Sequence, residues 1–142
     1  MMNDQVRTIM TKDPVVVGPN TTVSDVTKVM LDNRLQQLPV VQEGKLMGLV
    51  TSYDLWKRGG DLEKSQETPV SQIMNTNVLK ITPLDKVGTA AELFMDKRFK
   101  TLPVVNLRNE LKGVVTAFDV IRHALVEEYP RPILYADVVD KH

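Results

Sequence analysis

The chain of 142 residues contains no cysteine, has no net charge at neutral pH, and has few aromatic residues. The absence of cysteine excludes disulfides, thiolate nucleophiles and cysteine-based metal sites. Eighteen basic residues balance eighteen acidic ones, so no overall field attracts an anionic membrane, and the balance argues against nucleic acid as a partner. Any anion that the protein binds must therefore be recognised by a local group of residues.

Long apolar runs and several functional motifs are also missing. No run approaches the roughly 20 apolar residues that span a bilayer, so we expect no membrane insertion. Residues 1–3 open no secretory signal, and we expect a cytoplasmic protein. Residues 59–60 lack the lysine and the spacing of a phosphate-binding loop. No Ser/His/Asp constellation is present and His123 has no Asp, Cys or second His at ligand spacing, so we expect neither catalysis nor a metal site.

One unit occurs twice in the sequence. Residues 6–54 reappear as residues 70–119, and Leu-Pro-Val-Val stands at positions 38–41 and again at 102–105. The second copy has one extra residue in its loop at residues 106–110. A unit of about 60 residues buries little surface alone, so we expect the copies to pack together around a pseudo-twofold axis.

Each copy predicts the order strand, helix, strand, strand, helix, and hence an α+β fold. The β-branched residues 15–17 and residues 78–81 predict the two first strands, and Leu-Pro-Val-Val begins a hairpin in each copy. Thr21 or Thr22 is the expected N-cap of the first helix. Tyr53, Trp56 and Phe118 are interpreted as packing residues.

The polar stretch between the copies predicts a connector. We expect a first unit with its connector at residues 1–66, a second unit at 67–129, and a tail at 130–142 that begins with helix-breaking prolines.

The motif Gly-Φ-Val-Thr-x-x-Asp, in which Φ is Leu or Val, follows the hairpin in both copies, at residues 48–54 and 113–119. Amides at a helix start can receive a phosphate, a threonine hydroxyl can add a hydrogen bond, and an aspartate can accept two bonds from ribose hydroxyls. The same Thr-x-x-Asp spacing is also a helix-capping pattern, in which both side chains only satisfy backbone amides. The residues leave both interpretations open.

The paired hairpins, the two Gly-Φ-Val-Thr-x-x-Asp junctions and the repeat together resemble a tandem pair of cystathionine-β-synthase (CBS) domains, also called a Bateman module. The resemblance covers residues 6–128. It implies two β-α-β-β-α units packed as a pseudo-twofold pair, with clefts that bind adenosine nucleotides such as AMP, ADP or ATP. It also implies a regulatory, non-catalytic role with no obligatory cofactor, a homodimer, and a regulated partner such as an enzyme or transporter.

The resemblance also assigns ligand contacts. Asp54 and Asp119 match the family's ribose-binding aspartate, and Thr51 and Thr116 match its hydroxyl near the ribose and phosphate. The base would lie against the segments that enter the first strands, around Lys12, Asp13 and Val15 in one cleft and Thr76, Asn77 and Leu79 in the other.

The residues before Leu-Pro distinguish the two clefts. By the resemblance, Arg98 and Lys100 face the cleft of Asp54, whereas Arg34 and the uncharged Gln36 face that of Asp119. The first cleft should then prefer the more highly charged nucleotide. These cations could instead belong only to solvated helix ends, where they complement the helix dipole.

Two other functions remain open at this point. One is a structural dimerisation module without ligand, and the other is a sensor of S-adenosylmethionine or another adenosine derivative. Intact Thr and Asp in both copies argue against the structural role.

Overall fold

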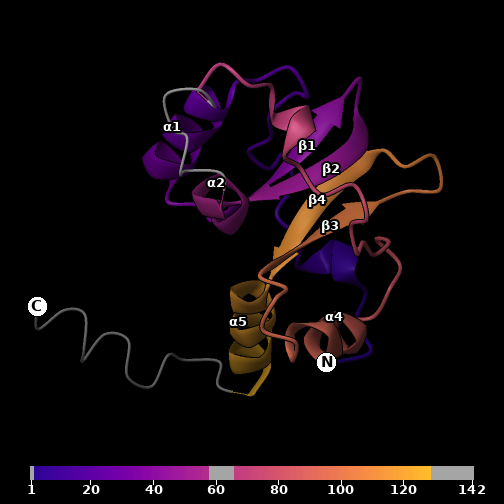
Figure 1. The fold of residues 1–142 in the computed structure, drawn as a ribbon. Helices are drawn as coiled ribbons and strands as arrows, with labels where there is room; N and C mark the ends of the chain where they lie inside the picture. The colour runs from indigo at the N-terminus through magenta and orange to yellow at the C-terminus, as the bar shows by residue number, and fades with distance from the viewer. Residues whose placement is uncertain (1, 58–65, 129–142) are drawn as a thin grey trace, which may run out of the picture.

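The computed structural model describes residues 2–57 and 66–128, and it consists of two similar halves whose hairpins lie together in the middle (Figure 1). The helices of each half lie at its outer end. In chain order, the elements are η1 (Val6–Thr8), α1 (Val23–Asn33), β1 (Gln37–Gln42), β2 (Lys45–Thr51), α2 (Ser52–Lys57), η3 (Val70–Gln72), α4 (Val87–Phe94), β3 (Thr101–Val105), β4 (Leu111–Thr116) and α5 (Ala117–Glu128). The α+β prediction is confirmed, and no helix within the described ranges is long and apolar enough to cross a membrane.

The two hairpins form as the repeat predicts. β1 pairs antiparallel with β2, and β3 with β4, in equivalent registers. Leu38 and Leu102, the first residues of the two Leu-Pro-Val-Val stretches, are completely buried. Glu43 and Gly44 both have positive φ values, 52° and 80°, which suit the tight turn of a two-residue hairpin. The hairpins also meet at their tips, where the Leu46 amide donates to the Asn109 carbonyl at 3.0 Å.

The predicted first strands are reduced to single parallel bridges, Val17 with Val40 and Ile81 with Val104. Val17 donates to the Pro39 carbonyl and accepts from the Val41 amide. Continuing this ladder upstream would require an amide hydrogen on Pro39, which proline lacks. Pro103 stops the second copy's ladder in the same way. The prolines of Leu-Pro-Val-Val therefore leave the chain before each bridge without a strand partner on this side.

The first helix of each copy packs through the apolar stripe that its spacing predicts. Val23, Val26 and Met30 of α1 are buried, and the Thr22 hydroxyl accepts the Asp25 amide at 3.2 Å, which identifies Thr22 as the N-cap. α4 is shorter than α1 and ends at Phe94, so Arg98 lies beyond its end.

The opening segment of each repeat packs against the other repeat. The amides of Val87 and Gly88, at the start of α4, donate to the carbonyls of Asp4 and Met2 at 2.8 and 2.9 Å. In the first copy, the amides at the start of α1 donate in the same way to carbonyls of residues 66 and 68. Helix-start amides have no partner within their own helix, so the exchanged segments supply the missing acceptors.

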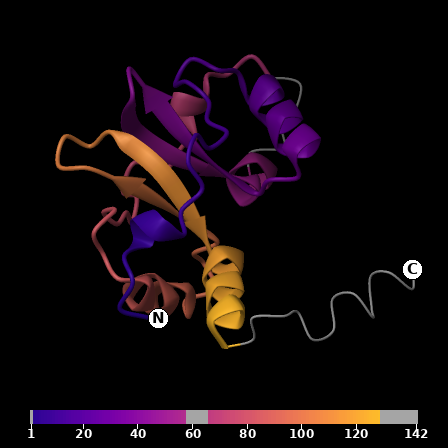
Figure 2. The same ribbon diagram turned by 180° about the vertical axis from the view of Figure 1, so that it is seen from behind.

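The hydrophobic cores reflect this exchange. Val6 of the first repeat is completely buried in the core of the second, beside Val87 and Leu102. Val70 of the second repeat is completely buried in the core of the first, beside Val26. Figure 2 shows the indigo opening segment lying against the orange and yellow half of the chain. Each packed unit therefore combines most of one repeat with the opening segment of the other repeat.

Two glycines allow the opening segments to cross the hairpins. A Cβ on Gly113 would lie 2.6 Å from the Thr11 carbonyl oxygen, and one on Gly48 would lie 2.9 Å from that of Asn75. The crossing segments pair with the next residue of each strand, Thr11 with Val114 and Asn75 with Leu49. The glycine of the repeated motif is thus required by the close approach of two backbones.

Tyr53, Trp56 and Phe118 do not pack as the sequence suggests. Their exposed fractions are 60%, 77% and 65%, because the rest of the described chain covers these sides of α2 and α5 only in part.

Replacing Gly113 with alanine should destabilise the fold by about 1–3 kcal/mol, because the new methyl group would force two backbones apart. Gly18→Ala is the matched control, since its Cβ would meet no atom closer than 3.8 Å. Urea unfolding measures both free energies. Equal stability of the two variants would contradict the proposed close approach.

Candidate functional site

Each strand-to-helix junction is closed by a reciprocal cap between its threonine and its aspartate. In the first copy, the Asp54 amide donates to the Thr51 hydroxyl oxygen at 3.0 Å, and Asp54 Oδ2 accepts the Thr51 amide at 2.9 Å. The Thr51 hydroxyl also donates to Asp54 Oδ2 at 2.8 Å. Thr116 and Asp119 repeat the two bonds to the amides, at 3.2 and 2.9 Å. The capping interpretation of Thr-x-x-Asp is therefore confirmed.

The cap uses only one oxygen of each carboxylate. In both aspartates it is Oδ2, and Oδ1 accepts no hydrogen bond from any residue in the described ranges. A carboxylate held in this way keeps an acceptor oxygen for a ligand hydroxyl. Asp54 is half-buried, whereas Asp119 is only 8% exposed. The two junctions thus share their geometry and differ in accessibility.

A cavity of about 190 Å³ lies beside Thr51, and both copies form its wall. The first copy contributes Gln37, Leu49 and Thr51. The second copy contributes residues from the segment before its first bridge and from the chain before β3, namely Asn75, Asn77, Val78, Leu79, Arg98, Phe99 and Thr101. The cavity thus brings Thr51 and Arg98, which the resemblance assigns to one cleft, together with Asn77 and Leu79, for which the resemblance left open which of the two clefts they border. Asp54 is not among the residues that line it.

A wider hollow of about 490 Å³ adjoins this cavity and shares Gln37, Thr51 and Arg98 with it. Its other wall residues are Gln36, Ser52, Tyr53, Lys97 and Lys100. Among the described residues that line it, three are cations and none is acidic. The hollow is therefore a local positive region in a chain without net charge, which favours an anionic ligand group.

Comparison with known families decides what this arrangement is. The family model of the CBS domain matches residues 6–55 and, separately, residues 70–126. The chain belongs to the CBS domain family. It contains a tandem pair of these domains, as the repeat predicts.

Individual relatives agree with this assignment. The protein MJ1225 of Methanocaldococcus jannaschii is 29% identical over 132 residues, which cover 85% of this chain; the chain spans 47% of that protein's length. The structure of CBSX2 of Arabidopsis thaliana in complex with AMP has a TM-score of 0.78 and 28% identity, over 87% of this chain and 98% of that one. The CBS pair of MJ0100, with 5′-methylthioadenosine and S-adenosyl-L-methionine, has a TM-score of 0.74 and 26% identity, with the same coverage of both chains.

Arg98 lines the cavity beside Thr51 and forms an ion pair with Asp96. Its Nε lies 3.1 Å from Asp96 Oδ1, and its Nη2 lies 2.7 Å from Asp96 Oδ2. These hydrogen bonds, reinforced by the guanidinium charge, lower the pKa of Asp96 to about 2, so the pair stays ionised at neutral pH. An anionic ligand would therefore compete with Asp96 for Arg98.

The other segment expected against a base, which contains Lys12, Asp13 and Val15, crosses the hairpin of the second repeat in the equivalent way. Thr11 pairs with Val114, two residues before Thr116, and the chain then continues through Lys12, Asp13 and Val15. All three residues are exposed, and Asp13 has a φ of 52°. In the other unit, Thr76 is exposed and is not among the residues that line the Thr51 cavity.

Of the two residues expected near Asp119, Gln36 lines the hollow beside Thr51 and Arg34 lines neither hollow. Gln36 lines the hollow beside Thr51, because its carbonyl accepts the Ser52 amide at 2.8 Å and so fixes it to its own unit's junction. Arg34 is the C-cap of α1 in the left-handed conformation, with a φ of 55° and an exposed side chain. The cations that line the hollow beside Thr51 therefore come from residues 97–100.

Gln37 is a wall residue that the sequence did not indicate. Its side-chain oxygen accepts the Thr101 amide at 2.9 Å, from one CBS unit to the other. Thr101 occupies the equivalent position in the second repeat, so the two first residues of Leu-Pro hairpins meet at the pseudo-twofold axis. Only a difference between the copies at this position, Gln against Thr, could have suggested the contact.

Replacing Gln37 with leucine should lower the free energy of unfolding by about 1–3 kcal/mol, because the half-buried Thr101 amide loses its acceptor. Gln42→Leu changes an exposed residue of the same strand and should cost less than about 0.5 kcal/mol. Chemical denaturation of both variants measures the difference. Similar small effects would show that the bond between the units contributes nothing.

Proposed function

We propose that the chain is a non-catalytic regulatory module that binds an adenosine nucleotide in the cleft beside Thr51 and Asp54. The observation that carries this proposal is the composition of the cleft wall. Both CBS units contribute to it, and three cations line the wider hollow. Asp54 lines neither hollow itself, but it is bonded to Thr51, which lines both, and it keeps a carboxylate oxygen that the cap does not use. The complex of the similar protein CBSX2 with AMP supports the same ligand class.

The wall offers a separate place for each part of the nucleotide. Asp54 Oδ1 would accept the ribose hydroxyls while Oδ2 keeps the helix cap. The base would lie along Asn77 and Leu79, whose segment has no strand partner beyond the Ile81 bridge because Pro103 lacks an amide hydrogen. The Asn77 amide already donates to Asn75 Oδ1 at 3.0 Å, so the edge of an adenine would meet the main-chain groups of the residues that follow Asn77.

The phosphates would lie in the wider hollow, near Arg98 and Lys100. A longer phosphate chain carries more charge and would separate Arg98 from Asp96 more effectively. This cleft should therefore bind ATP more tightly than it binds adenosine. The Asp119 cleft, with a nearly buried carboxylate, should bind more weakly.

A ligand in this position would couple the two units. It would contact residues of both repeats at once, so its affinity would depend on how the units are arranged relative to each other. A ligand shifts a conformational equilibrium by as much as its affinity differs between the two states. The arrangement of the units would then transmit the ligand state to a partner protein, such as an enzyme or a transporter.

The exposed apolar residues of α2 and α5 support a homodimer of pairs. Tyr53 and Trp56 on α2 are joined by Phe118, Ile121 and Leu125 on α5, and each is more than half exposed. Apolar side chains gathered on two helices are typical of a surface that another protein covers. We propose that a second copy of this chain covers these helices.

Adding AMP, ADP, ATP or S-adenosylmethionine should stabilise the protein against thermal unfolding if that compound binds. A hundredfold excess over the dissociation constant corresponds to about 2.7 kcal/mol. Asp54→Asn should keep the oxygen that serves the cap but lose the second acceptor, which should weaken binding at least about tenfold. Asp32→Asn, an exposed change on α1, is the control.

The outcomes separate the candidate functions. Stabilisation by S-adenosylmethionine alone would indicate a sensor of that compound, as the ligands of the MJ0100 pair suggest for a relative. No stabilisation by any of the four compounds would favour a structural dimerisation module and would contradict ligand binding.

Removing the charge of Lys100 should weaken ATP binding and leave adenosine binding unchanged, because only the phosphates would reach this residue. Asp96→Asn should have the opposite effect on ATP, since it releases Arg98 from its ion pair. Isothermal titration of Lys100→Gln and Asp96→Asn, with the exposed Lys28→Gln as control, measures both changes. Equal ATP affinity in all three variants would contradict the placement of the phosphates.

Trp56→Glu should dissociate the proposed dimer, because it places a charge within the apolar surface. Leu107→Glu is a suitable control, since Leu107 is fully exposed in the loop between β3 and β4, away from α2 and α5. Sedimentation velocity should find a dimer for the wild type and for Leu107→Glu, and a monomer for Trp56→Glu. A dimeric Trp56→Glu protein would place the interface elsewhere.

A further inference from the structure

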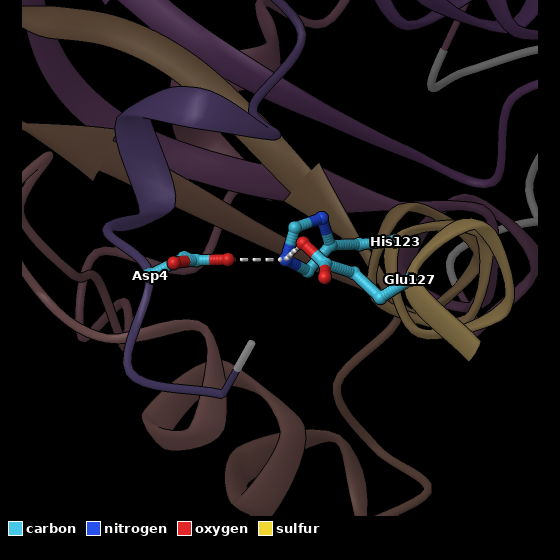
Figure 3. Close-up of side chains that lie close together, drawn as sticks. All are labelled: Asp4, His123 and Glu127. Carbon is cyan, nitrogen blue, oxygen red and sulfur yellow. Dashed lines mark hydrogen bonds and ion pairs between the residues drawn. The ribbon is translucent and has the colours of Figure 1, made fainter. Parts of the chain in front are cut away.

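Three side chains that can bind a metal converge beside α5 of the second CBS unit (Figure 3). His123 Nε2 lies 3.0 Å from Asp4 Oδ2 and 4.0 Å from Glu127 Oε1. One ligand atom from each of the three residues lies within 4.8 Å of the others. The His123 side chain is only 16% exposed, and the expectation of no metal site considered only the residues close to it in the sequence.

The backbone holds all three residues in place. His123 and Glu127 are four positions apart on α5, so they lie on the same side of the helix. Asp4 belongs to the exchanged opening segment, and its carbonyl accepts the Val87 amide at the start of α4. The neighbouring residue Gln5 is bridged to Lys86. These backbone contacts therefore hold the three side chains close together without a bound metal.

The donor set, one imidazole nitrogen and two carboxylates, is one that a divalent transition-metal ion accepts. One carboxylate is sufficient to pair with an imidazole, yet here two carboxylates approach the same nitrogen. Zinc binds nitrogen and carboxylate oxygen at about 2.0–2.2 Å in a tetrahedral arrangement, which places ligand atoms about 3.3 Å apart. The two recorded distances, 3.0 and 4.0 Å, lie on either side of this value, so small side-chain rotations would complete the geometry.

We propose that Asp4, His123 and Glu127 form a site for a divalent borderline cation of the zinc type. The side chains of Asp4 and Glu127 are 43% and 45% exposed, so water can reach the fourth coordination position. The ion would connect the opening segment of the first repeat to α5 of the second. The ion would bind α5 one helical turn beyond Asp119, which lies in the first turn of the same helix.

Zinc titration of the full chain, without an affinity tag and after treatment with a chelator, tests the proposal. We expect one tight site per chain, measured by competition with a chromophoric chelator. Glu127→Gln should weaken zinc binding at least about tenfold, because loss of a ligand should cost at least as much as loss of an outer-shell partner. This variant keeps the hydrogen bond between Asp4 and His123, so its fold should be unchanged.

Two controls make the result decisive. Glu128→Gln changes the neighbouring exposed carboxylate and should bind zinc as the wild type does. Cobalt(II), as a spectroscopic substitute, should show the strong visible absorption of four-coordinate cobalt in the wild type and lose it in His123→Asn. Absence of a tight site, or equal zinc affinity in Glu127→Gln and Glu128→Gln, would overturn the proposal.

Discussion

The structure depends on two antiparallel bridges through which each repeat receives the opening segment of the other, Thr11 with Val114 and Asn75 with Leu49. These segments supply acceptors for the first amides of α1 and α4, and they carry Val6 and Val70 into the opposite cores. A repeat of this size buries little apolar surface without such help. The same exchange places a segment of one unit beside the strand-to-helix junction of the other, which is why the cleft wall belongs to both.

Capping and ligand binding need not exclude each other at the Thr-x-x-Asp junctions. The cap occupies one carboxylate oxygen and fixes the direction of the other, so a ligand would meet an acceptor that is already oriented. The cations of the wider hollow come from the less regular chain between α4 and β3, where the sequences of the two copies differ. The residues that the two copies share thus form the junctions, and the residues that differ between the copies distinguish one cleft from the other.

The sequence predicted what local patterns determine. The hairpins, the main helices and the Thr-x-x-Asp junctions follow from periodicity, turn chemistry and capping, all of which act over a few residues. The sequence overestimated the length of the first strands, although the proline in Leu-Pro-Val-Val already indicated that their hydrogen-bond ladder would stop. The exchanged segments, the Gln37 contact and the position of Asp4 beside His123 could not be predicted, because they join residues far apart in the sequence without a local signal.

An NMR titration of the labelled chain with AMP tests the central claim most directly, namely that one ligand contacts both CBS units in the Thr51 cleft. We expect the amides of Thr51 and Asp54 in one unit and of Asn77, Leu79 and Thr101 in the other to shift together, with a single dissociation constant. Shifts confined to one unit, or to the exposed residues of α2 and α5, would contradict the account.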